Sequence, residues 1–190
     1  MDSFQEIYEK KAAIVLSELQ NTLLHLDAEQ VKLLVDSILC ARKVFAVGVG
    51  RVMLSLQAFV KRLAHLGVDA HYVGEITEPA ITRDDLLIVG SGSGESIFPK
   101  NIAFKAKDLG AKIIHIGSNT ESGIKAICDG MLRIPVRTKL GLPDEIASSQ
   151  PMSSLFEQSL LLLGDVVAMI IMERKNLDMS LLWTYHANLE

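Results

Sequence analysis

The chain has 190 residues, of which 49% are hydrophobic and 22% are charged, and both proportions are ordinary for a soluble globular protein. This length is typical of one domain whose core needs no disulfide or metal for stability. Because 19 basic and 23 acidic residues give a net charge of −4 and the basic residues form no runs, we expect no nucleic-acid partner.

Cysteine usage and hydropathy indicate where the protein resides. Cys40 and Cys128 lie far apart without a CxxC motif, which indicates neither a zinc site nor a disulfide framework and fits a reducing compartment. The amino terminus is charged and lacks the apolar core of a secretory signal. The most apolar stretch, residues 160–172, is shorter than the roughly 20 residues that cross a bilayer. We therefore predict a cytoplasmic protein with no membrane partner.

Residues 1–41 are predicted to form an N-terminal arm of two helices. Apolar residues recur at helical spacing from Phe4 to Val15 and again from Val31 to Ile38. Asp27 is a suitable N-cap for the second helix, with Gln30 three residues later as in a capping box. Such an arm packs on its own domain or against another subunit.

Residues 42–190 are predicted to form an α/β core, so that the whole chain, 1–190, is a single domain. Short apolar segments bounded by glycine or polar residues alternate with helical stretches at about 52–66, 98–109 and 121–128. This alternation is typical of a doubly wound, flavodoxin-like parallel sheet with helices on both faces. The five predicted strands are 44–50, 70–74, 86–94, 112–118 and 131–136.

The last third of the core enters a long helix. Proline at position 151, preceded by Ser148 and Ser149, is a good signal for the start of a helix over about 151–174. The second half of this helix is apolar nearly all round. We therefore expect it to be central in the domain or buried at a subunit interface.

The strongest candidate site follows the third predicted strand. Glycines there let the backbone turn tightly and point its N–H groups inward, and serine hydroxyls add further donors. Several neutral donors around three oxygens are what a phosphate monoester requires, so we favour an anion site; the alternative is a plain strand-to-helix turn. The loop consists of Ser91, Gly92, Ser93, Gly94, Glu95 and Ser96.

A second candidate follows the first strand of the predicted sheet. Residues 48–51 read Gly-Val-Gly-Arg, which is neither GxGxxG nor a Walker A loop, and this argues against dinucleotide and ATP chemistry. In a doubly wound sheet the loops flanking the switch point face each other. Arg51 and the 91–96 loop are therefore expected to share one ligand; the alternative is a surface arginine in a tight turn.

Glu157 is a candidate general base on the long helix. A carboxylate close to apolar residues such as Phe156 and Leu160 has its pKa raised by desolvation, which suits proton abstraction; the alternative is a solvated or salt-bridged glutamate. The five histidines form no metal-binding spacing, so no metal is expected. His65 and His115 are interpreted as packing residues.

Several segments, in order over residues 44–190, resemble those of the SIS (sugar isomerase) domain family, and most closely its 6-phospho-3-hexuloisomerases. The motif SGSGES alone is typical of the whole superfamily. The combination of LFEQ with a terminal HANLE is typical of a much smaller group within it, the 6-phospho-3-hexuloisomerases. The resemblance implies an enzyme that converts 3-hexulose 6-phosphate to fructose 6-phosphate through a cis-enediol, without metal or nicotinamide cofactor. The segments are FAVGVGR, RLAHLG, YVGEITEPAI, DDLLIVGSGSGES, SSQPMSSLFEQSLLLLGDVV and HANLE.

The resemblance also implies roles for individual residues. Serines 91, 93 and 96 would bind the phosphate of a phosphorylated sugar, with Gly92 and Gly94 shaping a loop that includes Glu95. Gly50 and Arg51 would lie near the phosphate, and Glu157 would be the catalytic base. His186 would handle ring opening or proton transfer, and the tail that carries it is a candidate to complete a neighbouring subunit's site in a homo-oligomer, a tetramer or a dimer.

Two departures from the family pattern bear on the substrate. The family has a serine where this chain has Val52, so one donor to the phosphate is lost. Glu78 adds a negative charge in a segment that is threonine-rich in the family. Two alternatives therefore stay open: a phosphosugar-binding SIS module without catalysis, and an isomerase of a different phosphosugar.

Overall fold

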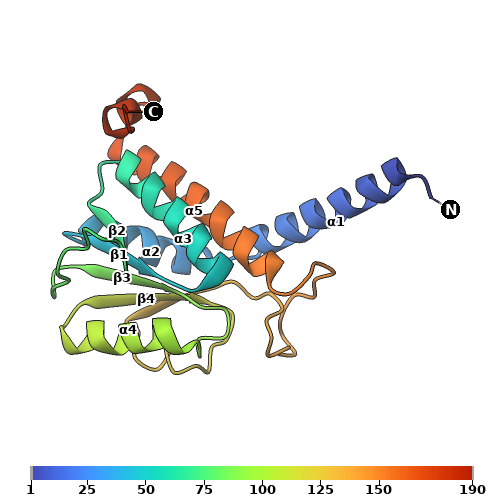
Figure 1. Ribbon diagram of the computed structural model, residues 1–190, viewed down its shortest axis with the longest axis horizontal. Coiled ribbons are helices and arrows are strands. Elements are labelled where there is room, and N and C mark those ends of the chain that lie inside the picture. The colour runs from blue at the N-terminus through green and yellow to red at the C-terminus, as the bar shows by residue number, and fades with distance from the viewer. Residues whose placement is uncertain (1, 190) are drawn as a thin grey trace.

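A computed structural model of the protein describes residues 2–189 and shows helices packed on both faces of a sheet (Figure 1). The elements follow in the order α1 (Phe4–Leu24), α2 (Ala28–Cys40), β1 (Val44–Val47), α3 (Gly50–His65), β2 (Ala70–Tyr72), β3 (Leu86–Gly90), α4 (Ile97–Asp108), β4 (Lys112–Gly117), β5 (Gly130–Arg133), α5 (Ser154–Lys175) and the short 3-10 helix η1 (Met179–Tyr185).

Within the described residues, five parallel strands form one sheet in the order β2-β1-β3-β4-β5. This is the doubly wound, flavodoxin-like order, with its switch point between β1 and β3, and it confirms the predicted fold class. Val44 pairs with Leu86 and Ile88 with Ile114, so the central strands run in close register. The loops that follow β1 and β3 therefore emerge side by side.

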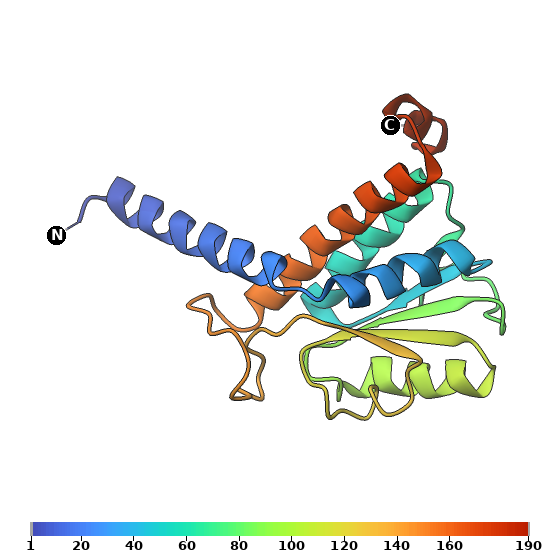
Figure 2. The same ribbon diagram turned by 180° about the vertical axis from the view of Figure 1, so that it is seen from behind.

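The sheet is buried on both faces because its strands alternate between two apolar cores. Val44 and Ala46 of β1 face the core formed with α2, α3 and α5, whereas Phe45 and Val47 face the core formed with α4. Figures 1 and 2 show the same division, with α4 alone among the labelled helices on its side of the sheet. Helices on both faces explain why the neighbouring strands β1 and β3 are apolar and buried throughout.

The N-terminal arm is confirmed as two helices, and α1 extends away from the sheet (Figures 1 and 2). Its outer half is exposed, including Phe4 and Tyr8, while Thr22 near its end is fully buried. Asp27 caps α2 as predicted by accepting hydrogen bonds from the next N–H groups. The predicted capping box is not completed, because the side-chain oxygen of Gln30 accepts from the N–H of Arg133 at 2.7 Å instead.

Two predicted helix positions are wrong. Residues 121–128 form turns rather than a helix: the N–H of Ile127 bonds to the carbonyl of Ile124 only three residues back, and the chain enters β5 at Gly130 before a regular helix is completed. The long helix begins at Ser154 rather than near position 151, because Met152 has a left-handed backbone with φ of 55° that cannot continue a helix.

Helix α5 is long and apolar enough to cross a membrane by length and composition alone, and half of its most apolar window is buried in the molecule. The central helix of a soluble protein meets the same criterion. One side of α5, including Phe156 and Leu163, belongs to the core, as predicted. Its other side leaves large apolar side chains exposed: Leu161, Leu162, Val166 and Met169.

Candidate functional site

One pocket of about 290 Å³ lies at the carboxyl edge of the sheet, where the turn after β1, the loop after β3 and the start of α5 meet. The topology dictates this meeting, because the two loops flank the switch point. The pocket brings together seven of the residues singled out from the sequence: Gly50, Arg51, Ser91, Gly92, Ser93, Ser96 and Glu157. Of the other predicted site residues, the described lining leaves out Gly94, Glu95 and His186.

The 91–96 loop is folded tightly by its glycines. Gly94 has a left-handed φ of +66°, and its N–H donates to both the carbonyl and the hydroxyl of Ser91 at 3.1 Å. The side-chain amide of Asn119 donates to the carbonyl of Ser93 at 3.1 Å. The loop therefore has one fixed shape in which the serines line the pocket.

His115 supports this loop from beneath. The side chain is fully buried in β4, and its Nε2 lies 2.9 Å from the carbonyl oxygen of Ser91. Burial lowers the pKa of His115 to about 4, so the ring is neutral at neutral pH. Because a carbonyl only accepts, Nε2 carries the proton and donates it. The sequence analysis interpreted this histidine as packing; the structure adds a hydrogen bond that fixes the loop.

Glu95 points away from the pocket and braces the outside of the loop. Its carboxylate accepts from Lys100 Nζ at 2.6 Å and from the N–H of Gly123. The hydrogen bond from Lys100 holds the pKa of Glu95 below its usual value. Of the loop residues predicted to bind ligand, Glu95 thus contacts the 121–128 turns rather than the pocket.

Glu157 and Arg51 form an ion pair inside the pocket. Arg51 Nε donates to one carboxylate oxygen of Glu157, and the hydroxyl of Ser153 donates to the other at 3.1 Å. Ser55 of α3 donates to the backbone carbonyl of Glu157 at 2.8 Å. The Glu157 side chain is nearly buried, whereas Arg51 is largely exposed. The carboxylate is thus held at the pocket wall beside a cation that is accessible to a ligand.

Val52 occupies the position where the family pattern has a serine. A Cβ on Gly90 would lie 2.9 Å from a methyl of Val52, so the valine side chain packs directly on the strand end that leads into the 91–96 loop. It also lines the pocket. An apolar group therefore stands where the family pattern has a hydroxyl.

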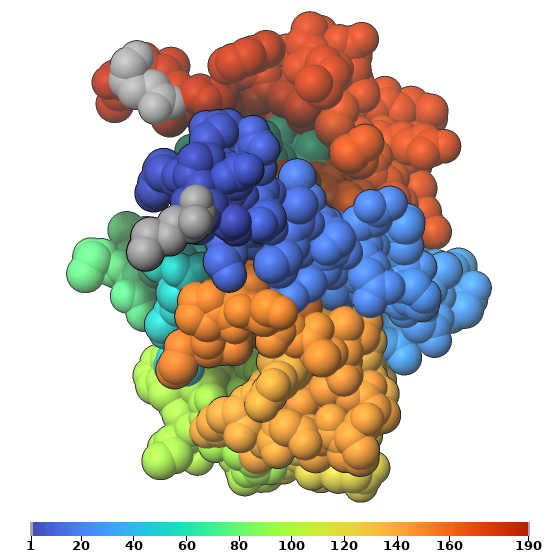
Figure 3. All heavy atoms as spheres, turned by 90° about the vertical axis from the view of Figure 1, so that its right-hand side faces the viewer, coloured from blue at the N-terminus to red at the C-terminus, as the bar shows by residue number. Residues whose placement is uncertain are grey.

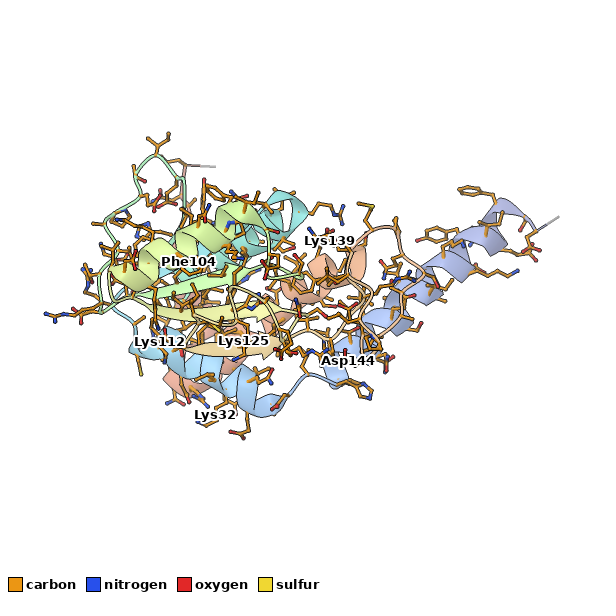
Figure 4. The ribbon with its side chains drawn as sticks, turned by 90° about the horizontal axis from the view of Figure 1, so that it is seen from below. Lys32, Phe104, Lys112, Lys125, Lys139 and Asp144 are labelled. Carbon is orange, nitrogen blue, oxygen red and sulfur yellow. The ribbon has the colours of Figure 1, made fainter. Side chains whose placement is uncertain are left out.

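Two pocket residues, Thr138 and Lys139, were not predicted from the sequence; both lie on residues 134–147, which we call the linker and which lead from β5 toward α5. The carboxylate of Glu145 accepts from the N–H and hydroxyl of Thr138 and from the N–H of Leu142, and so folds the linker over the pocket. Lys139 lies on this linker beside the start of α5 (Figure 4). The linker has neither the apolar periodicity of a helix nor that of a strand. Local sequence patterns therefore could not show that Thr138 and Lys139 reach the pocket.

His186 lies far from Glu157 within the same chain. Its ring stacks on His65 at a centroid distance of 5.0 Å and contacts Trp183 at the same distance. This places it near the end of α3, where the C-terminal tail follows η1 (Figure 1). The residues 2–189 contain no group of three or more His, Cys, Asp or Glu side chains arranged to hold a metal.

Comparisons with known proteins identify the family of the chain. The family model of the SIS domain matches residues 37–170. A 3-hexulose-6-phosphate isomerase of Bacillus subtilis (strain 168) is 41% identical over 178 residues, which cover 94% of this chain and 96% of that protein. A protein of the same name from Mycobacterium gastri is 36% identical, covering 94% of this chain and 89% of its own.

A solved structure shows the same fold. The structure of a Methanococcus jannaschii protein, described as inferring a molecular function of 3-hexulose-6-phosphate isomerase, superposes with a TM-score of 0.81 at 32% identity, over 95% of this chain and 99% of that one. The family model covers most of the chain, and the relatives align along nearly its full length. The chain therefore belongs to the SIS domain family.

Proposed function

We propose that this protein is a sugar-phosphate isomerase that interconverts 3-hexulose 6-phosphate and fructose 6-phosphate through a cis-enediol. The observation that carries the proposal is that the serine- and glycine-rich loop 91–96 and a nearly buried carboxylate, Glu157, share one pocket. The names of the Bacillus subtilis and Mycobacterium gastri relatives support the same reaction.

The phosphate is held by the loop after β3. The hydroxyls of Ser91, Ser93 and Ser96 line the pocket, and the following helix α4 directs the positive end of its dipole toward bound anions. Arg51 supplies a charge at the opposite wall. These groups bind the end of the sugar that does not react, and so place the reacting carbons against Glu157.

Glu157 moves the proton. As a phosphosugar oxygen draws the Arg51 guanidinium toward itself, the carboxylate accepts the proton from C2 of 3-hexulose 6-phosphate, and the C2–H electrons form the C2–C3 double bond of the enediol. Return of a proton to C3, with transfer of the O2 hydroxyl proton to O3, moves the carbonyl to C2. No hydride leaves the substrate, so the reaction needs no nicotinamide.

The protein acts as a homo-oligomer, a tetramer or a dimer, in the cytoplasm. The exposed apolar face of α5 and the exposed apolar residues of α1, such as Phe4 and Tyr8, support an assembly. His186 is remote from Glu157 in its own chain, so a role in ring opening requires that the tail reach the site of a neighbouring subunit.

Proton NMR of fructose 6-phosphate with the protein in D₂O tests the proposed function. We expect the C3 proton signal to disappear and a 3-ketose to appear, because enediol formation exchanges that proton with solvent. Exchange at C1 instead would assign an aldose–ketose isomerase. An absence of exchange in a sample that the sugar still stabilises against heat would favour a binding module without catalysis.

Replacing Lys139 with Met is expected to raise the KM for the phosphosugar about tenfold and to change kcat little. The side chain lines the pocket and forms no ion pair with the described residues, and a hydrogen bond to a charged ligand contributes roughly 1.5 kcal/mol, which is about tenfold in affinity. Lys112→Met, which changes an exposed lysine at the opposite edge of the sheet, is the matched control. An equal KM for both variants would remove Lys139 from the site.

A further inference from the structure

Residues 148–153, which we call the strap, connect the linker to α5 and form one wall of the pocket. Met152 and Ser153 line the pocket itself. Ser148 and Gln150 line an adjoining polar cavity of about 360 Å³ that shares Met152 and Ser153 with it. The strap therefore lies between the pocket and this second cavity and contributes side chains to both.

Glu18 of α1 holds the strap. Its carboxylate accepts hydrogen bonds from the Ser148 hydroxyl at 2.7 Å, from the N–H of Ser149 at 2.7 Å and from the side-chain amide of Gln150 at 3.0 Å. These partners lie 130 or more residues away in the sequence. Figure 3 shows the surface of the strap and linker (orange) against that of α1 (blue).

An ionised carboxylate is the form best suited to these three hydrogen bonds, because both oxygens act as charged acceptors and neither carries a proton that would face a donor. Burial by itself would raise the pKa of Glu18, but the hydrogen bonds from Ser149, Ser148 and Gln150 outweigh it and hold the pKa below its usual value. Glu18 is therefore charged at neutral pH and pairs fully with the strap.

The strap connects the residues that Glu18 binds to a hydrogen-bond donor of Glu157. Two residues, Pro151 and Met152, separate Gln150 from Ser153, whose hydroxyl donates to Glu157 Oε1 at 3.1 Å. Met152 has a left-handed φ of 55°, which is strained for a residue with a long side chain and persists only where both ends of the segment are held. The ends here are held by Glu18 and by α5.

We propose that Glu18 is a positioning residue of the active site, which holds the strap so that Ser153 fixes the Glu157 carboxylate. This inference rests on the proposed function of Glu157. When an amide replaces the charged carboxylate, one of its two acceptor oxygens becomes an NH2 group that faces a donor, so at least one hydrogen bond to the strap is lost and the strained turn at Met152 relaxes. The orientation of the base changes, while the phosphate loop, which is fixed by Asn119 and His115, stays in place.

Glu18→Gln tests this role through turnover. We expect kcat to fall about tenfold, since losing hydrogen bonds to a charged group raises the barrier by roughly 1.5 kcal/mol, with KM changed less than about twofold. Glu18→Asp keeps an acceptor-only charge and should restore part of kcat. The matched control is Glu9→Gln, which removes an exposed carboxylate from the same helix. A kcat for Glu18→Gln equal to that of Glu9→Gln would overturn the proposal.

Hydrogen exchange of the backbone amides of residues 148–150 tests the contact independently of activity. We expect faster exchange at Ser149 in Glu18→Gln and unchanged exchange in Glu9→Gln. Equal exchange in the two variants would overturn the proposal. Absence of turnover in the unmodified protein would instead reject the proposed function, and exchange at Ser149 would still show whether Glu18 holds the strap.

Discussion

A Glu157→Gln variant is expected to lose about 10²- to 10⁴-fold in kcat, the range for removing a general base, while it still binds the phosphosugar. The amide has nearly the same shape as the carboxylate and keeps one oxygen that can accept from Arg51 or Ser153. It cannot take a proton from carbon. Because Glu157 is nearly buried between α3 and α5, preserving its shape keeps the pocket wall intact.

The measurement is kcat together with the rise in melting temperature that the phosphosugar produces. Glu173→Gln, which makes the same change at an exposed position of the same helix, should leave both quantities at their original values. Near-normal turnover in Glu157→Gln would show that another group removes the proton. Loss of thermal stabilisation along with turnover would assign Glu157 to binding instead.

Gly94→Ala is expected to weaken binding of the phosphosugar about 100-fold. A Cβ at this position would lie 2.2 Å from the hydroxyl oxygen and 2.4 Å from the Cβ of Ser122, which is itself buried. The loop must therefore shift, and the left-handed φ of +66° adds strain. Displacing the Ser91 and Ser93 hydroxyls removes two hydrogen bonds to a charged group, each contributing roughly 1.5 kcal/mol.

Isothermal titration with fructose 6-phosphate measures this loss. Gly74→Ala is the matched control, because Gly74 also has a positive φ, of +95°, but an added Cβ would meet no atom within 4 Å. The control separates backbone strain from displacement of the phosphate loop. An affinity of Gly94→Ala within about threefold of the Gly74→Ala value would place the phosphate elsewhere.

Much of the site was predictable from sequence because its parts follow strand ends. Residues 91–96 and Arg51 each come directly after a buried parallel strand, and the topology of a doubly wound sheet brings such loops to one edge. Their meeting in one pocket is confirmed. The roles of the serines, Arg51, Glu157 and His186 in the reaction stay predictions. Its apolar neighbours made Glu157 a candidate and the resemblance to the family strengthened it, whereas the role of His186 comes from the resemblance alone.

Two local patterns predicted features that the folded chain does not form. Residues 121–128 form turns rather than a helix, and the chain then enters β5 at Gly130. Gln30 matches a capping box, but its side-chain oxygen accepts from the N–H of Arg133, more than 100 residues away. Local spacing contains no information about where either segment meets the rest of the fold.

The amino-acid pattern was enough to predict the class of fold and the edge of the sheet that carries the pocket, because apolar periodicity and glycine placement act over neighbouring residues. Three further contacts depend on the folded chain: His115 on the 91–96 loop, Lys139 in the lining of the pocket, and Glu18 on the strap. Each of these side chains acts through groups that folding brings together from distant parts of the chain, so their positions depend on the packing of whole elements rather than on nearby sequence.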